Sequence, residues 1–446
     1  MQSPAAIFRR VHGRNRSWLW PILYGLVAGL IIVAFRVAIN LLFASFFKRP
    51  ATVGGEGFLW VSLLTIVLSS LFVGVATKVA PFVAGGGVPE VKLAFWGKLE
   101  HSPWRIAVIK FLASAIGIGG GQSLGRAGPA VQIGSNLALS LAKLLGVSKQ
   151  NRRAATAAGA AAGLAADFNT PLAALAFVFE GISGRLNKPS LAPVLLASVT
   201  GAFVVHAFGD PQPAFVFPQI SEPTWRAYSL IPLSAAFAAL IGGFFQRGTL
   251  ALRDKARGVS AVPSWVHPVV AGIITWAIGA TVFMWGGGLG VFSLGYDNIS
   301  DLLAHGIIWK IAVALLAGKF IATLTAYGLG GCGGIFSPTL FFGAMSGAVV
   351  AALGRHFMGV TNADAVLVIA SGMSACFAAV AQAPVTAILI IFEMTHQFAL
   401  VPGLVLAGLV SHPIARALNR MNFYDAILQQ DGHNIEHLVS PADLRS

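Results

Sequence analysis

The sequence predicts an all-α polytopic membrane protein made of two related halves, and three observations support this fold class: composition, apolar runs and an internal repeat. Of the 446 residues, 56% are hydrophobic and 10% are charged, whereas a soluble domain carries about 25% charged residues. Apolar runs of roughly 20 residues, the length that crosses a hydrocarbon core, recur from 18–35 to 307–327. Shorter runs at 171–182 and 384–394 begin with Pro and predict broken helices.

The basic residues predict the topology. The chain has 30 Lys and Arg against 16 Asp and Glu, but most basic residues lie between apolar runs, which disfavours nucleic-acid binding. Four arginines, Arg9, Arg10, Arg14 and Arg16, precede the first run. The positive-inside rule therefore predicts a cytoplasmic segment at 1–17 and a multi-pass protein of the cell membrane with both termini in the cytoplasm, in contact with the lipid bilayer.

An internal repeat divides the chain. The run AGAAAGLAADFNTPLAALAFVFE at 158–180 matches SGMSACFAAVAQAPVTAILIIFE at 371–393, with Glu180 aligned to Glu393 at an offset of 213 (393 minus 180). Upstream, GPAVQIG at 128–134 matches SPTLFFG at 337–343 at an offset of 209 (337 minus 128). We expect one membrane domain over 1–446, with halves at 18–215 and 216–420 that meet near 210–227, and a short tail at 421–446. The sequence leaves open whether the halves are parallel or inverted.

Three glycine-rich segments interrupt the apolar pattern: GGGVPE at 85–90, GRAGPAVQ at 125–132 and GGIFSPTLFFG at 333–343. Each runs from glycine into proline and then into apolar residues, which is typical of a helix start. Irregular backbone at membrane depth is tolerated where it is buried in protein or lines a cavity. A helix start presents free N–H groups and about half a positive charge, so several together predict an anion site that needs no Lys or Arg. The alternative is that the glycines only permit close helix packing.

These segments, together with Tyr424 in NFYDAIL and the run ending APVTAILIIFEMT, resemble the CLC family of chloride channels and proton-coupled chloride transporters, in its prokaryotic form without CBS domains. The resemblance implies an inverted-repeat fold of tilted and broken helices, a homodimer with one pathway per subunit, chloride or another small inorganic anion as substrate, and no cofactor. It also implies which residues bind the anion, through backbone groups and the Tyr424 hydroxyl: Gly85, Gly86, Gly87, Val88, Pro89, Gly128, Ile335, Phe336 and Tyr424.

The chain departs from the family pattern at three positions. Gly86 stands where the family commonly has a serine that favours chloride over nitrate, which leaves the selectivity open. Ala127 stands at the position of the gating glutamate, and Gly181 at that of an inner proton-carrying acid. Whether Ala127 is natural or engineered is also open. Coupling needs a titratable group that alternates between proton and anion, so the sequence predicts passive conduction of chloride or a similar anion.

Three other functions are less consistent with these residues. A proton-coupled chloride antiporter would need another acid, and Glu180 beside Gly181 marks a possible proton or water path. Because Glu180 and Glu393 are equivalent in the repeat, a structural role at a helix end is the favoured interpretation of both. A fluoride exporter ranks low because that branch lacks the GGGVPE form. An enzyme ranks low because HExxH, GxSxG and phosphate-loop motifs are missing, and no metal site is expected.

Overall fold

The computed structural model describes residues 4–98, 103–184, 188–208, 215, 217–220, 223–258, 262–306 and 308–433. The side chains of the arginines before residue 17, most of the segment where the halves were expected to meet and residues 434–446 lie outside this part. The first half contains α1 (Pro4–Phe43), α2 (Arg49–Val53), α3 (Glu56–Val79), α4 (Val88–Phe95), α5 (Pro103–Gly119), α6 (Ala127–Leu144), α7 (Lys149–Phe168), α8 (Pro171–Phe177) and α9 (Lys188–Phe208). The second contains α10 (Trp225–Gly258), α11 (His267–Val282), α12 (Tyr296–His305), α13 (Trp309–Gly328), α14 (Phe336–Met358), α15 (Asn362–Ala381), α16 (Pro384–Thr395), α17 (Val401–Leu418) and α18 (Phe423–Gln430).

The described residues include nine helical segments long and apolar enough to cross a membrane. On α3 the exposed face carries Trp60, Leu64 and Leu68, while the buried face includes Ser62 and Ser69. Large apolar side chains that face outward and small polar ones that face inward suit a helix in lipid, where small residues allow close packing. The expected all-α polytopic fold is therefore confirmed.

Equivalent helix pairs in the two halves cross at equivalent glycines. A Cβ on Gly134 of α6 would lie 2.3 Å from the carbonyl oxygen of Gly159 on α7. A Cβ on Gly343 of α14 would likewise lie 2.3 Å from the carbonyl oxygen of Gly372 on α15. At these four positions the glycines serve close packing of helices in a membrane.

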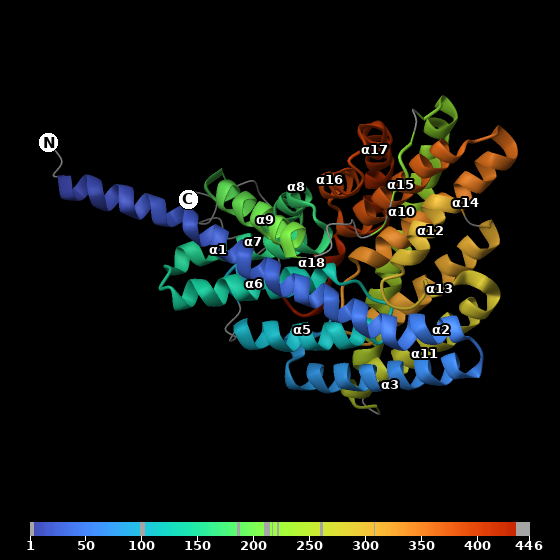
Figure 1. The fold of residues 1–446 in the computed structure, drawn as a ribbon, viewed down its shortest axis with the longest axis horizontal. Helices are drawn as coiled ribbons and strands as arrows, with labels where there is room; N and C mark the ends of the chain where they lie inside the picture. The colour runs from blue at the N-terminus through green and yellow to red at the C-terminus, as the bar shows by residue number, and fades with distance from the viewer. Residues whose placement is uncertain are drawn as a thin grey trace.

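A two-fold relation between the halves appears in two glutamates. Glu393 accepts hydrogen bonds from the N–H groups of Leu172 and Ala173 at 2.9 and 2.7 Å, and Glu180 accepts them from Val385 and Thr386 at 3.1 and 2.8 Å. The two contacts are equivalent in the repeat. Glu393 minus 213 is Glu180, and Leu172 and Ala173 plus 213 are Val385 and Thr386. Only a two-fold rotation exchanges partners in this way. In Figure 1 α6, α7 and α9 lie to the left and α10, α13, α14 and α15 to the right, with α8 and α16 where the groups meet.

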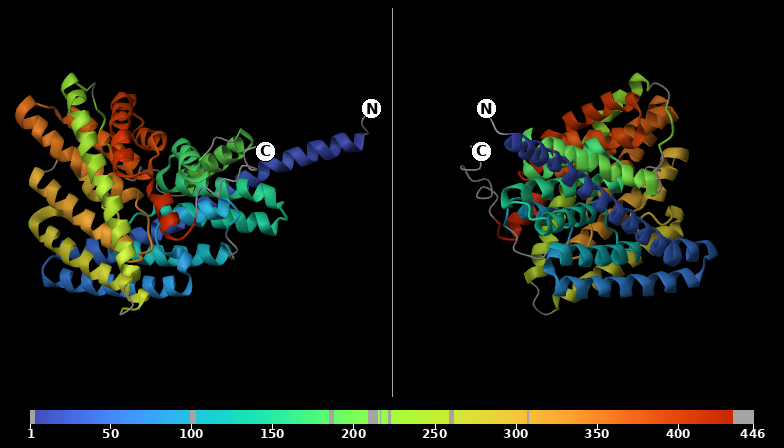
Figure 2. Two further views of the ribbon diagram at one scale, coloured as in Figure 1. Left: turned by 180° about the vertical axis from the view of Figure 1, so that it is seen from behind. Right: turned by 60° about the vertical axis from the view of Figure 1, so that its left-hand side comes forward.

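Helices α3 and α11 run antiparallel along one flank of the molecule, at the bottom of Figures 1 and 2. The indole of Trp276 donates to the Ser62 hydroxyl at 3.0 Å, and Gly272 faces Ser70. Gly74 lies against the carbonyl group of Trp265. From Ser62 to Gly74 the residue numbers rise along α3, while those of their partners fall from Trp276 to Trp265, as in an antiparallel pair. With 24 residues at about 1.5 Å each, α3 is roughly 36 Å long, which is long enough to cross a hydrocarbon core of about 30 Å.

Candidate functional site

The starts of α4, α6 and α14 meet at three glycines. A Cβ on Gly128 would lie 2.4 Å from the Gly86 carbonyl oxygen and 3.2 Å from the Gly334 Cα. A Cβ on Gly86 would lie 3.3 Å from the same Gly334 Cα. Two segments of the first half and one that lies more than 200 residues further along the chain (334 minus 128 is 206) are thus brought into backbone contact. Only glycines at positions 128 and 334 let them approach so closely.

Backbone hydrogen bonds fix the approach. Gly125 and Gly334 exchange N–H···O bonds of 2.7 Å in both directions, joining the turn before α6 to the turn before α14. The Gly85 N–H donates to the Gly331 carbonyl at 2.8 Å. Gly85 and Gly87 have φ of 68° and 85°, a left-handed conformation that costs glycine little. The chain can therefore turn sharply into Val88, the first residue of α4, with Pro89 in the first turn as expected.

The arrangement offers free N–H groups to a ligand. The first N–H groups of a helix have no partner within it, and α6 begins at Ala127 while α14 begins at Phe336. Ile335 is the residue before the α14 start, and both it and Phe336 are buried. The structure thus brings the predicted residues Gly86, Gly128, Ile335 and Phe336 to one place. Binding of an anion there remains a prediction.

Aromatic contacts bring Tyr424 to the same place. Its ring lies 6.0 Å from Phe177, whose ring lies 5.4 Å from Phe336. The Asn422 side chain accepts from the Asp425 N–H at 2.9 Å and caps α18, which begins at Phe423. An ion pair between Lys92 of α4 and Asp425 then ties α18 to the helix that follows Gly87. These contacts fix the position of the predicted Tyr424 ligand beside the start of α14.

Tyr327, at the end of α13, is a site residue that sequence reasoning missed. Its hydroxyl accepts a hydrogen bond from the Gly86 N–H at 3.3 Å, and a Cβ on Gly86 would lie 3.7 Å from the same oxygen. Its ring is 5.0 Å from Phe423, which neighbours Tyr424. A hydroxyl is therefore present beside Gly86 although residue 86 itself supplies none. The only signal in the sequence is a tyrosine directly before a glycine-rich segment.

Lys110 of α5 was also missed. Its side chain is fully buried, and its Nζ donates to the carbonyl oxygens of Val83 and Gly85 at 2.8 and 2.6 Å. The expectation that the anion site needs no lysine or arginine stays a prediction. One buried lysine holds the turn before α4, although it contacts the carbonyl oxygens of that turn rather than the free N–H groups.

A cavity of about 290 Å³, which we call the Arg126 cavity, opens beside the start of α6. It is lined by Arg36, Lys48, Arg126, Ser293 and Tyr296, among others. Arg126 caps α6 directly before the fully buried Ala127. Its guanidinium lies 5.4 Å from the Tyr296 ring centroid. This cavity therefore reaches the residue next to the expected gate position.

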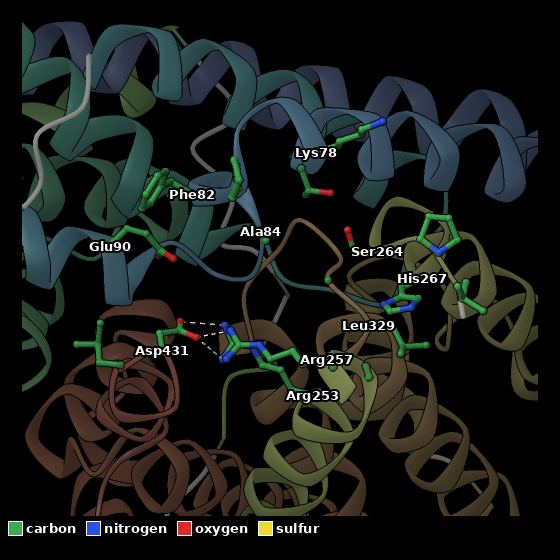
Figure 3. A pocket seen from close by; sticks show the side chains of 18 of the residues that line it. Lys78, Phe82, Ala84, Glu90, Arg253, Arg257, Ser264, His267, Leu329 and Asp431 are labelled. Atoms are coloured by element: carbon green, nitrogen blue, oxygen red, sulfur yellow. Dashed lines mark hydrogen bonds and ion pairs between the residues drawn. The ribbon is translucent and has the colours of Figure 1, made fainter. Parts of the chain in front are cut away.

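A second cavity of about 850 Å³, the Asp431 cavity, lies at the other end of α3 (Figure 3). Lys78 near the end of α3 and His267 at the start of α11 line it, whereas Lys48, which precedes α3, lines the Arg126 cavity. It also includes Glu90 of α4 and Ala84, next to the Gly85 turn. The two cavities thus lie at opposite ends of a helix of membrane length, with the three helix starts between them.

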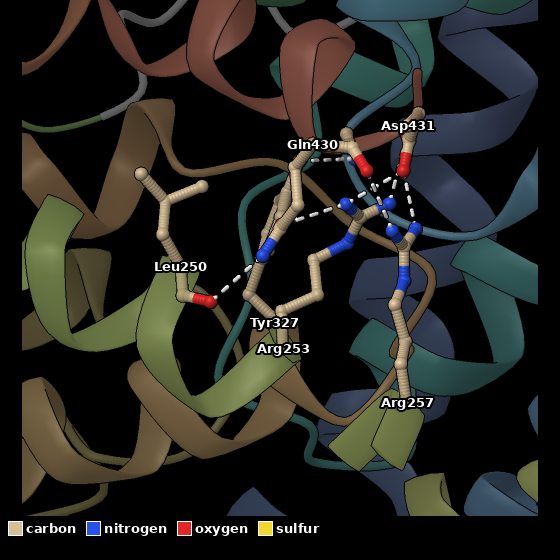
Figure 4. Close-up of polar contacts among 7 residues, drawn as sticks. Leu250, Arg253, Arg257, Tyr327, Gln430 and Asp431 are labelled. Carbon is tan, nitrogen blue, oxygen red and sulfur yellow. Dashed lines mark hydrogen bonds and ion pairs between the residues drawn. The ribbon is translucent and has the colours of Figure 1, made fainter. Parts of the chain in front are cut away.

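Asp431 holds one wall of the larger cavity together. Figure 4 shows Arg253 and Arg257 converging on its carboxylate. The Arg253 Nη1 lies 2.8 Å from Asp431 Oδ1, and Arg257 also pairs with it. Burial alone would raise the pKa of Asp431, but the hydrogen bonds and charges of the two arginines outweigh burial and lower this pKa. The contacts join the end of α18 to the end of α10.

Glu180 does not reach the candidate site. Besides two N–H groups of α16, its carboxylate accepts the Thr386 hydroxyl at 2.6 Å. This geometry matches the favoured structural interpretation, since a carboxylate at a helix start stabilises the free N–H groups. A Cβ on Gly181 would lie 2.9 Å from the Phe177 ring, so a side chain there would press on the residue between Tyr424 and Phe336. The possible proton path through Glu180 gains no support from these contacts.

Comparisons with known proteins agree on one family. The family described as "Voltage gated chloride channel" matches residues 65–416. The H(+)/Cl(-) exchange transporter ClcA of Vibrio campbellii is 27% identical over 418 residues, covering 91% of this chain and 87% of the relative. ClcA of Yersinia pseudotuberculosis is 26% identical, covering 91% of this chain and 85% of the relative.

Solved structures share the fold. A slow cyanobacterial Cl-/H+ antiporter superposes with a TM-score of 0.82 at 23% identity, covering 93% of this chain and 98% of that chain. A CLC-type fluoride/proton antiporter superposes with a TM-score of 0.75 at 20% identity, covering 92% and 97%. At these identities the likeness establishes the fold and no more.

Proposed function

Since the chain belongs to the voltage-gated chloride channel family, we propose that it carries chloride or a similar small anion across the membrane. One observation carries the proposal: three helix starts converge between two cavities that lie at opposite ends of α3. Free N–H groups attract an anion with partial charges. They bind it less tightly than an unpaired lysine or arginine would in a low dielectric, so the ion can leave quickly.

The proposed path begins in the Arg126 cavity and passes the small side chain of Ala127. It continues to the N–H groups near Gly86, Gly128 and Phe336, between the hydroxyls of Tyr327 and Tyr424, and ends in the Asp431 cavity. With the segment 1–17 in the cytoplasm, as the positive-inside rule predicts, α1 ends on the other side of the membrane, where Phe43 and Lys48 line the Arg126 cavity. The Asp431 cavity then faces the cytoplasm. As in the family it resembles, we expect a homodimer with one pathway in each subunit.

We further propose that the transport is passive. Ala127 and Gly181 lack titratable groups, and Glu180 is held at the start of α16 by three donors. Stoichiometric exchange needs acids that pass a proton from one side of the anion path to the other. None of these three residues provides that step.

Proton-coupled chloride exchange is the second candidate. The relatives from Vibrio and Yersinia are named H(+)/Cl(-) exchange transporters, so the comparisons alone favour exchange over passive conduction. What favours passive conduction is the chemistry of this chain's own residues at positions 127, 180 and 181. Recording the movement of chloride and of protons in the same experiment distinguishes passive conduction from proton-coupled exchange.

Efflux of chloride from liposomes that contain the purified protein tests the proposed transport. We expect efflux well above that of protein-free liposomes once valinomycin and potassium remove the voltage limit. Ala127→Glu should slow efflux at neutral pH, because a carboxylate at the start of α6 competes with the anion for the same N–H groups. Wild-type efflux equal to that of protein-free liposomes would contradict the proposed function.

A further inference from the structure

A buried ion pair lies directly behind the position of the missing gate. The Arg126 Nε is 2.6 Å from Asp167 Oδ1, and the side chains are 3% and 0% exposed. Arg126 also donates to the Asp167 carbonyl oxygen at 3.3 Å. Removing two charges from water is costly, and their attraction often fails to repay the cost. Such a pair therefore calls for an explanation beyond stability.

The repeat shows that the fold does not require this pair. Adding the offset of 209 to 126 makes Arg126 equivalent to Ile335, and adding the offset of 213 to 167 makes Asp167 equivalent to Val380. Both second-half residues are apolar and buried. The same backbone arrangement is thus built in the second half without charges, and the ion pair belongs to the first half alone.

The pair is connected both to the cavity and to the anion site. Arg126 lines the Arg126 cavity and precedes Ala127, at the start of α6. Asp167 lies in the last turn of α7, next to Phe168, whose ring lies 5.7 Å from that of Phe336. An anion that enters through this cavity therefore meets a guanidinium whose charge is balanced by a carboxylate behind it.

The charged surroundings of Asp167 are simple. Among the described residues it has electrostatic contact with Arg126, with Arg36 of α1 and with Tyr296 of α12. Other elements packed against α7 also carry ionisable groups, none of which contacts Asp167: Glu90 and Lys92 on α4, Lys143 on α6, Glu180 after α8 and His206 on α9. Asp167 therefore lies within electrostatic reach of two cations of the cavity, Arg126 and Arg36.

The Arg126–Asp167 contact is close but poorly directed. Although Nε and Oδ1 are at ion-pair distance, neither carboxylate oxygen of Asp167 accepts a well-aligned hydrogen bond from any described residue. The short distance identifies an ion pair, and both carboxylate oxygens keep acceptor positions that no aligned donor fills. A buried carboxylate with free acceptor positions is costly in its ionised form.

We propose that Asp167 replaces the missing gate carboxylate of this chain, by competing with the transported anion for the charge of Arg126. Ionised Asp167 occupies the guanidinium and disfavours anion entry. When a proton from the Arg126 cavity neutralises Asp167, Arg126 becomes the partner of the anion. Binding of the proton and of the anion then favour each other reciprocally. The inference rests on the proposed function and adds proton control to it.

This control does not require proton transport. A proton that binds Asp167 finds no acid at position 127 or 181 to pass it onward, and Glu180 is occupied at the start of α16. The proton therefore returns to the cavity from which it came. Asp167 acts as a positioning residue for Arg126, and the anion itself contacts Arg126.

Chloride efflux as a function of pH tests the proposal, with Asp167→Asn as the variant. We expect wild-type efflux to rise as pH falls on the Arg126 side, by up to about tenfold per unit while Asp167 is mostly ionised. Asp167→Asn keeps the shape but cannot titrate, so its efflux should change less than about twofold over the same range. Asp297→Asn is the matched control. Asp297 lines the same cavity but pairs with Lys48, at 2.7 Å, and is exposed.

A second measurement does not depend on the folding of a variant. Purified wild-type protein, titrated with chloride in weakly buffered solution, should take up protons, which a pH indicator reports. Absence of proton uptake, a flat wild-type pH profile, or an Asp167→Asn profile like that of wild type would each overturn the role of Asp167. Wild-type protein that passes no chloride at any pH would instead overturn the proposed function.

Discussion

Each cavity is lined by an arginine that pairs with an aspartate, Arg126 with Asp167 and Arg253 with Asp431, but the two pairs differ in their exposure to water. Arg126 and Asp167 have almost no exposed side-chain surface, whereas the side chains of Arg253 and Asp431 are 20% and 24% exposed and that of Arg257 is 46% exposed. Exposed pairs are screened and worth little. Buried pairs carry a large desolvation cost. The same chemistry therefore fastens α18 in one cavity and makes anion entry sensitive to charge in the other.

Replacing Arg126 with isoleucine should have the largest effect on stability. It leaves Asp167 buried without its ion-pair partner and should lower the unfolding free energy by about 3–5 kcal/mol. The double variant Arg126→Ile with Asp167→Val copies Ile335 and Val380 of the second half, and it should recover most of this loss. Denaturant titration in detergent micelles measures both variants. A double variant as unstable as the single one would show that the second half is a poor guide to the first.

Glu180→Gln and Glu393→Gln should have the next largest effect on the unfolding free energy. Each removes the charge that meets the start of the opposite short helix, and each should cost about 0.5–2 kcal/mol of unfolding free energy. The loss at Glu180 should be somewhat greater, because Glu180 also accepts the Thr386 hydroxyl. The same denaturant titration applies. If Glu180→Gln left stability unchanged but altered proton movement, Glu180 would belong to a proton path instead.

Tyr327→Phe should change anion binding more than stability. The variant loses the hydroxyl that accepts the Gly86 N–H, and one hydrogen bond is worth about 1 kcal/mol, or roughly fivefold in affinity. Chloride titration calorimetry and the ratio of chloride to nitrate efflux measure the change. Tyr228→Phe, on a half-buried tyrosine of α10, is the control. Equal behaviour of the two variants would remove Tyr327 from the site.

Lowering the pH should reduce the unfolding free energy by a small amount, through protonation of Asp431. Because the pKa of Asp431 is lowered in the folded protein, its contribution to stability is present above the unfolded value of about 4 and is lost as pH falls through the folded value. The partly exposed pairs limit the effect to about 1 kcal/mol. Stability of wild type and of Asp431→Asn, measured from pH 6 down to about pH 3, should converge at the acidic end. If the stability of the two proteins differed by the same amount at every pH, the pKa of Asp431 would not be lowered by folding.

The sequence predicted the fold class, the repeat and the helix starts, because these depend on local composition and on periodic patterns. Pro89, Pro129 and Pro338 each lie in the first turn of a helix, as their glycine-rich contexts indicate. Tyr327 could not be assigned in this way, since its contact with Gly86 spans 241 residues. Asp167 left one trace, an acid opposite Val380 in an otherwise apolar repeat, but its partner Arg126 is revealed only by the packing of α7 against α6.

The most direct test of passive transport records chloride efflux and external pH together, in liposomes whose voltage is set by valinomycin and potassium. With an inward proton gradient and no chloride gradient, an exchanger must drive chloride, whereas a passive pathway cannot. We predict chloride efflux without stoichiometric proton uptake, and no chloride movement driven by the proton gradient. Chloride pumped by that gradient in a fixed ratio to protons would contradict the account, and would place this chain with the exchangers it resembles.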